Sequence, residues 1–202
     1  MAKLEIPTKR LTYEEFLAWC DEDTWAEWVE GEVVVLSPAS RRHQEIFGFL
    51  SNILSIYAQA HDLGTLLTAP FQMHLAALRR GREPDLLFVA KERLHLLKET
   101  YLDGPADLVI EIISSESRLR DRGEKFAEYE LGGVQEYWLI DPEERRADFY
   151  RLGEDERYRI VDLEPEGIYR SQIIPGFWLR VKWLWREPLP PVLDVLRELE
   201  LI

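Results

Sequence analysis

Hydrophobic and polar residues recur along this chain with two periods, and the period changes from one segment to the next. Apolar residues spaced three and four apart are typical of helices, whereas short β-branched apolar runs are typical of strands. Thr12 with Glu15 forms a capping-box pattern, Ser40 is a candidate N-cap, and Gly64 follows the longest apolar stripe. The predicted helices cover residues 12–20, 41–63, 120–131 and 190–202.

The remaining apolar segments predict strands separated by turns. Gly31 lies between two β-rich runs and predicts a hairpin within residues 24–38. The charged stretch from Arg79 to Glu83 is interpreted as a polar turn. Further predicted strands cover residues 65–70, 71–76, 84–90, 108–113, 135–141, 146–152, 157–163 and 168–174. The predicted fold is a mixed β-sheet core flanked by helices, α/β or α+β, with extra antiparallel strands at its end.

Composition sets bounds on this fold. The chain has 202 residues, 46% of them hydrophobic, which is enough for one sizeable core, and we expect one domain over residues 1–202. Cys20 is the only cysteine, so an intrachain disulfide is excluded and a reducing cytoplasm is favoured. No apolar run approaches the ~20 residues of a membrane span, and residues 1–16 lack a signal core. We expect neither export nor membrane insertion.

The net charge of −13 weighs against a protein that binds nucleic acid, because phosphate affinity comes largely from lysine and arginine. Local charge can differ from total charge, however. Eight of the 25 basic residues fall in three short clusters: Arg41 and Arg42; Arg79, Arg80 and Arg82; and Arg118, Arg120 and Arg122. Each cluster is either a solvated face or part of a basic surface, and the sequence leaves both interpretations open.

A glutamate inside an apolar strand is the first chemical clue. Glu111 lies between Leu108-Val109-Ile110 and Ile112-Ile113. An ionised carboxylate buried without a partner costs roughly several kcal/mol, so a compensating group is expected. That group could be an arginine of residues 118–122, a proton or a metal ion.

Asp85 and Lys125 favour the metal ion. Asp85 follows a proline, which limits strand pairing, and heads an apolar strand, so two acids on two strands can converge on one cation. Magnesium suits such a site because it binds through one or two carboxylates and keeps several waters. Lys125 lies on the helix that returns across the sheet after Glu111. Alternatively, Asp85 is an ordinary strand-start acid and Lys125 is a solvated helix residue.

Taken in order along the chain, several segments resemble a known family. They are YEEFLAW, WAEWVEGEVVVLSPAS, the helix that contains His43, EPDLLFV, ADLVIEIISSESRLRDRGEKFAEYELGGVQEYWLIDP and IIPGFWLRV. Together they are similar to the Uma family of restriction endonucleases, a branch of the PD-(D/E)XK nuclease superfamily. The similarity covers roughly residues 11–185, and its ordered set of motifs is specific.

The resemblance implies a four-stranded mixed core sheet with a helix on each side and a metal site on its strands. Asp85 matches the motif aspartate and Glu111 the acid of (D/E)XK; with the Ile112 carbonyl they would hold Mg²⁺ or Mn²⁺. Ile113 stands where the motif has lysine, and Lys125 matches the position to which this family has moved that lysine.

Two further residues match the family less specifically. Glu27 matches the first acid of an E-x-x-x-G-E segment and could complete the metal shell, with Glu30 and Glu32 as rivals; a surface hairpin glutamate is the alternative. His43 matches a family histidine that could contact the substrate. An imidazole near a helix start can also be a hydrogen-bonded packing group.

The implied activity is hydrolysis of phosphodiester bonds in DNA by a cytoplasmic, metal-dependent endonuclease that forms a homodimer or higher homo-oligomer. Lys125 would orient the attacking water. The clusters of Arg79, Arg80 and Arg82 and of Arg118, Arg120 and Arg122 would contact DNA, since chain connectivity keeps both near the ion. Three alternatives stay open: a nuclease-fold protein that binds nucleic acid or a protein partner without cutting, a metal-dependent hydrolase of small phosphoesters, and a structural subunit.

Overall fold

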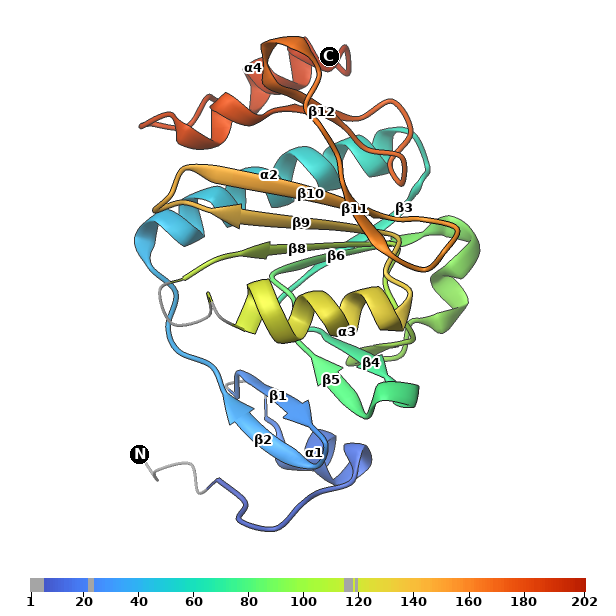
Figure 1. Ribbon diagram of the computed structural model, residues 1–202. Coiled ribbons are helices and arrows are strands. Elements are labelled where there is room, and N and C mark those ends of the chain that lie inside the picture. Colours follow the sequence, from blue (N-terminus) through green and yellow to red (C-terminus); the bar gives the residue numbers. More distant parts are fainter. Residues whose placement is uncertain (1–5, 22–23, 115–117, 119) are drawn as a thin grey trace.

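The largest element of the computed structural model is a six-stranded sheet of order β11-β10-β9-β8-β6-β3 (Figure 1). The structure describes residues 6–21, 24–114, 118 and 120–202. The strands are β3 (Gly64–Thr68), β6 (Leu86–Ala90), β8 (Leu108–Ile112), β9 (Glu136–Asp141), β10 (Arg146–Leu152) and β11 (Tyr158–Ile160). Neighbouring strands are antiparallel except β8 and β9, which are parallel. The crossover that joins these two includes a π-helical turn (Arg120–Glu124) and α3 (Lys125–Gly132).

Each face of this sheet has its own core because successive residues of a strand point to opposite sides. Long α2 (Arg41–Ala60), capped by Ser40, covers one face (Figure 1). The strand residues packed beneath it include Leu86, Phe88, Leu108, Ile110, Ile112, Trp138 and Ile140. The opposite core contains Leu87, Val89, Val109, Ile113, Tyr137 and Leu139, together with Tyr129 of α3. Short α4 (Val192–Glu198) packs against α2.

A second sheet, of order β2-β1-β5-β4-β7, lies next to α3. Its strands are β1 (Ala26–Val29), β2 (Glu32–Val35), β4 (Gln72–Leu75), β5 (Arg80–Arg82) and β7 (Tyr101–Asp103). The short α1 (Tyr13–Trp19) packs beside β1. A separate ribbon pairs β12 (Ile168–Arg170) with β13 (Trp178–Arg180), and 3-10 turns cover Ala76–Leu78, Lys91–Leu96, Pro165–Gly167 and Val181–Trp185. No helix among the described residues has the length and apolar character to cross a membrane.

The predicted mixed sheet flanked by helices is confirmed, and so are the capping box at Thr12, the hairpin at Gly31 and the four helices. The interpretation of residues 79–83 as a polar turn is wrong. Only Arg79, with φ 55°, has a turn conformation; Arg80–Arg82 form β5, which is hydrogen-bonded between β1 and β4. Charge compensation from other segments makes a buried, arginine-rich strand possible here.

Candidate active site

The two acids predicted to share a cation lie next to each other at the end of the sheet and line one pocket. β6 and β8 pair antiparallel with Leu86 opposite Ile110, and continuing that register by one residue places Asp85 opposite Glu111. Asp85 Oδ2 accepts a hydrogen bond from the Ile112 amide at 2.7 Å. The next residue in register, Pro84, has no N–H to donate to the Ile112 carbonyl. Two carboxylates and a backbone carbonyl are therefore available at one strand end.

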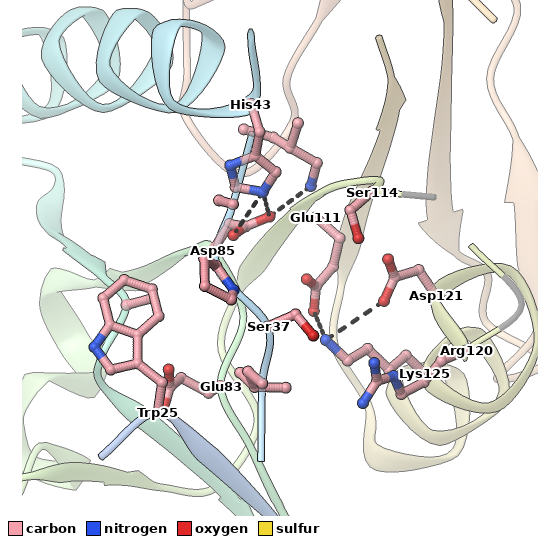
Figure 2. Close-up of a pocket in the computed structure, with 15 residues that line it drawn as sticks. Trp25, Ser37, His43, Glu83, Asp85, Glu111, Ser114, Arg120, Asp121 and Lys125 are labelled. Atoms are coloured by element: carbon pink, nitrogen blue, oxygen red, sulfur yellow. Dashed lines mark hydrogen bonds and ion pairs between the residues drawn. The ribbon is translucent and has the colours of Figure 1, made fainter. Parts of the chain in front are cut away.

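These groups line a pocket of about 90 Å³ (Figure 2). Its walls come from the end of the β1–β2 hairpin, the start of α2, the ends of β6 and β8 and the crossover before α3. The lining residues are Trp25, Leu36, Ser37, Pro38, Ala39, His43, Ala69, Glu83, Asp85, Glu111, Ile112, Ser114, Arg120, Asp121 and Lys125. Asp85, Glu111 and Lys125, predicted from three separate segments, thus meet in one cavity.

Lys125 holds Glu111 directly. Its Nζ donates to Glu111 Oε1 at 2.9 Å, and the Tyr129 hydroxyl donates to the same oxygen at 2.7 Å. Lys125 and Tyr129 are four residues apart on α3, so they project from one helix face toward β8. Ile113, at the position of the usual motif lysine, packs in the core on the α3 side of the sheet. The ammonium group thus reaches the strand acid from a helix.

The Lys125 ammonium also contacts two further carboxylates. Its Nζ is 3.0 Å from Glu27 and 3.5 Å from Asp121. The other oxygen of Glu27 accepts from Arg82 at 2.7 Å, and Arg82 in turn donates to Glu128 at 2.7 Å. Glu27 is fully buried and does not line the pocket. Both oxygens of Glu27 are held by cationic side chains, so the structure places Glu27 in an ion-pair network, and its part in a metal shell stays a prediction.

Burial and charge shift the pKa values of Lys125, Glu27 and Glu111 in different directions. Burial alone would lower the pKa of Lys125, but Glu111, Glu27 and Asp121 raise that pKa well above its ordinary value. Burial would raise the pKa of Glu27, yet Lys125 and Arg82 hold it below 4.5. Burial, opposed by Lys125 and reinforced by Asp121 and Asp85, raises the pKa of Glu111 to about 8. One ammonium group cannot compensate every carboxylate around it, which leaves room for an additional cation.

His43 contacts Asp85 from the first turn of α2. Its Nε2 lies 3.2 Å from the Asp85 carboxylate, and its backbone amide donates to the Ser40 Oγ cap at 3.2 Å. The imidazole is buried, and its Nδ1 has no hydrogen-bond partner among the described residues. This placement allows His43 to orient the Asp85 carboxylate.

The predicted basic surface is largely neutralised by acids. Arg82 is 1% exposed and paired with Glu27 and Glu128, so its assignment as a DNA contact is wrong. The pairs of the other arginines are Arg80 with Glu30 and Glu128, Arg118 with Asp141, Glu143 and Glu144, and Arg122 with Asp141 and Asp148. Arg79 is exposed, and Arg120 lines the pocket 3.9 Å from Glu27. Of these six described arginines, Arg120 is the one in the pocket wall.

Glu83 is the pocket acid that the sequence interpretation missed, because it was assigned to a polar turn. It is buried; its Oε2 accepts from Gln72 at 2.9 Å, and its Oε1 has no partner within the part of the chain that the structure describes. Burial and the nearby charge of Glu27 raise the pKa of Glu83 to about 8. Glu83 directly precedes Pro84-Asp85, and this position in the sequence could have indicated that it belongs to the site.

Glu83→Gln should stabilise the metal-free protein at alkaline pH. Because the pKa of about 8 lies above the ordinary 4.5, Glu83 favours folding below pH 4.5, and that contribution is lost as the pH rises to 8. We expect roughly 2 kcal/mol or more of added stability at pH 8.5, given ~1.36 kcal/mol per pKa unit, and almost none at pH 4.5. Urea unfolding in EDTA at both values measures this. An equal effect at both values would contradict the raised pKa.

The residues present fit a hard divalent cation, although the donor set is small. Among the residues that the structure describes, no three His, Cys, Asp or Glu side chains gather as a metal-binding group. Mg²⁺ needs no such group, since it commonly binds one or two carboxylates and keeps several waters. Asp85, Glu111 and the Ile112 carbonyl supply oxygen donors of this kind.

A mixed sheet with two acids in one pocket at its end, one of them held by a lysine from a helix, is typical of the restriction-endonuclease-like class. The family Uma2, described as "Putative restriction endonuclease", matches residues 13–182. The match spans most of the chain, and the protein belongs to the Uma2 family. This membership confirms the resemblance seen in the sequence and supports a nuclease, a hydrolase, as the activity class.

Two further comparisons show proteins to which this chain is similar. "Uncharacterized protein sll1609" from Synechocystis sp. is 24% identical over 161 residues, which cover 79% of this chain and 90% of that protein. A crystal structure described as "a putative nuclease belonging to DUF820" from Anabaena variabilis superposes with a TM-score of 0.73 at 18% identity. The superposition covers 87% of this chain and 97% of that one, and it supports the fold.

Proposed function

We propose that this protein is a divalent-metal-dependent endonuclease that hydrolyses phosphodiester bonds in DNA. The observation that carries the proposal is that Asp85, Glu111 and Ile112 line one pocket at neighbouring strand ends, with buried Lys125 bound to Glu111. Family membership supports the reaction class. The choice of Mg²⁺ or Mn²⁺ as the cation and of DNA as the substrate goes beyond family membership and is our proposal.

The chain's own residues would prepare the site in three ways. Asp85 and Glu111 present the oxygen donors, with His43 and the Ile112 amide holding the Asp85 carboxylate in place. Lys125 fixes Glu111 and places a positive charge beside the phosphate; its strongly raised pKa suits a permanent cation rather than a proton donor. When bound, a divalent cation supplies neutralisation of the phosphate and activation of water.

Cleavage assays test the proposal directly. The protein should cut supercoiled plasmid and linear duplex DNA with Mg²⁺ or Mn²⁺ and should lose this activity in EDTA. Internal cutting of a circular substrate identifies an endonuclease. Absence of cutting for DNA and RNA substrates with both metals would refute the proposal.

Metal binding should be visible without catalysis. A cation that binds only the folded protein raises its stability by about 2.7 kcal/mol at one hundred times its Kd. Thermal unfolding in EDTA should therefore shift upward when Mg²⁺, Mn²⁺ or Ca²⁺ is added, and Asp85→Asn should remove the shift. Asp103→Asn, at an exposed aspartate of β7 outside the pocket, is the control and should retain it. A parent protein whose melting ignores all three ions contradicts a metal site.

A second candidate is a metal-dependent hydrolase of small phosphoesters. The observation that favours it is the pairing of Arg80, Arg118 and Arg122 with carboxylates, which leaves little free positive charge for a long phosphate backbone. Hydrolysis of bis(4-nitrophenyl) phosphate without cleavage of any nucleic acid would select this candidate over the endonuclease.

A further inference from the structure

A second hollow adjoins the candidate active site. It has a volume of about 490 Å³ and shares one wall with the catalytic pocket, formed by Trp25, Leu36, Ser37, Pro38 and Ala39. Thr24, Val35 and Gln44 complete its lining. Figure 2 shows Trp25 on the opposite side of Asp85 from Lys125 in that view. A ligand that extends beyond the candidate active site along this shared wall would reach the second hollow.

Trp25 is exposed to an unusual degree for its type. It is 42% exposed, and Val35 in the same hollow is 44% exposed, whereas most large apolar side chains of the chain are buried. The backbone beneath the indole is fixed: the Trp25 carbonyl accepts from the Leu36 amide at 2.9 Å, which continues the β1–β2 ladder. An exposed aromatic ring on a fixed backbone is a preformed platform for stacking.

The charges of the protein limit how else it could hold nucleic acid. The net charge is −13, and Arg80, Arg118 and Arg122 are paired with acids. Phosphate contacts alone would therefore supply little affinity. Stacking of a base on an aromatic ring needs no positive charge, and every base has a face for it.

We infer that the hollow holds the base of an unpaired nucleotide that adjoins the scissile phosphate, stacked on Trp25. This inference rests on the proposed function, because a phosphodiester in the catalytic pocket brings a neighbouring base to the shared wall. Gln44, which is exposed at the edge of the hollow, offers an amide to the base edge. The preferred substrate is single-stranded, frayed or flipped-out DNA rather than continuous duplex, since a paired base cannot leave its stack without cost.

Binding of short single-stranded oligonucleotides tests the inference. Fluorescence anisotropy with Ca²⁺ compares an ordinary oligonucleotide with one in which abasic sites keep the phosphates and remove the bases. Trp25→Ala should weaken binding of the ordinary strand by about tenfold or more, the loss expected for one stacked base. It should leave binding of the abasic strand unchanged. Trp25→Phe, which keeps an aromatic face, should retain most of the affinity.

Ile160→Ala is the matched control, because Ile160 is a 57% exposed apolar residue on β11 and lies outside both pockets. Equal loss for ordinary and abasic strands, or no loss in Trp25→Ala, would overturn the stacking site. So would conversion of a dimeric parent to a monomer by Trp25→Ala in sedimentation, which would assign the hollow to a second copy of the chain.

The experiments distinguish failure of the endonuclease proposal from failure of the base-stacking site. If plasmid is cut equally by the parent and by Trp25→Ala and the single strand is bound equally by both, the endonuclease stands and the base site falls. If Trp25→Ala selectively weakens the ordinary strand but no nucleic acid is cut with any metal, the base site stands and the nuclease activity falls.

Discussion

Asp85→Asn should abolish DNA cleavage, with a rate loss of about 10³-fold or more, corresponding to roughly 4 kcal/mol of transition-state stabilisation. Asparagine keeps the size of the side chain, and its carbonyl oxygen can still accept from the Ile112 amide. It lacks the negative charge that a divalent cation requires. Plasmid nicking at saturating Mg²⁺ measures the loss, and thermal unfolding in EDTA establishes that the fold is retained.

Two companion variants sharpen this result. Glu111→Gln should lose activity to a similar extent, because it removes the neighbouring charge while its amide oxygen can still accept from Lys125 and Tyr129. Asp103→Asn, outside the pocket, should cut at the parent rate. Activity of Asp85→Asn within tenfold of the parent would remove Asp85 from the site.

The core of the fold could be predicted because its signals are local. The strand around Glu111 is a short apolar run, α2 has a cap at Ser40 and an apolar stripe, and α1 has a reciprocal capping box. β5 could not be predicted in this way. Its arginines become strand residues because Glu27 lies on β1 and Glu128 lies on α3, and both contacts join segments far apart in the sequence.

In the candidate site, too, some features have local sequence signals and others depend on contacts between distant segments. Asp85 and Glu111 could be proposed together because Asp85 heads one apolar strand and Glu111 lies within another, where a carboxylate is costly. Glu27 could be recognised as a conspicuous acid, but its partners could not be assigned. The sequence gives spacing along the chain, whereas the choice between a metal ligand and an ion-pair partner depends on distances of about 3 Å between segments. Glu83 was missed for the same reason, since its burial follows from packing beside Gln72.

The carboxylates around Lys125 affect both the stability of the protein and the proposed catalysis. Lys125 lies among Glu111, Glu27 and Asp121, so the group that would support phosphate chemistry also holds the crossover against the sheet. A simple loss of activity on changing Lys125 would therefore be ambiguous. A background in which one of its carboxylates is already neutral separates the two contributions.

Lys125→Met should lower the free energy of unfolding by about 3–5 kcal/mol near neutral pH, because buried carboxylates lose the cation that they contact. In a Glu27→Gln background the same change should destabilise the protein less, since one of those charges is gone. Urea unfolding of the parent, the two single variants and the double variant gives the coupling energy between Lys125 and Glu27.

The effect of Lys125→Met on activity should be different. If Lys125 supplies charge beside the phosphate, Lys125→Met should lower the cleavage rate by about 10²-fold or more even in the Glu27→Gln background. Cleavage equal to that of Glu27→Gln alone, once both proteins are folded, would show that Lys125 acts only in the structure.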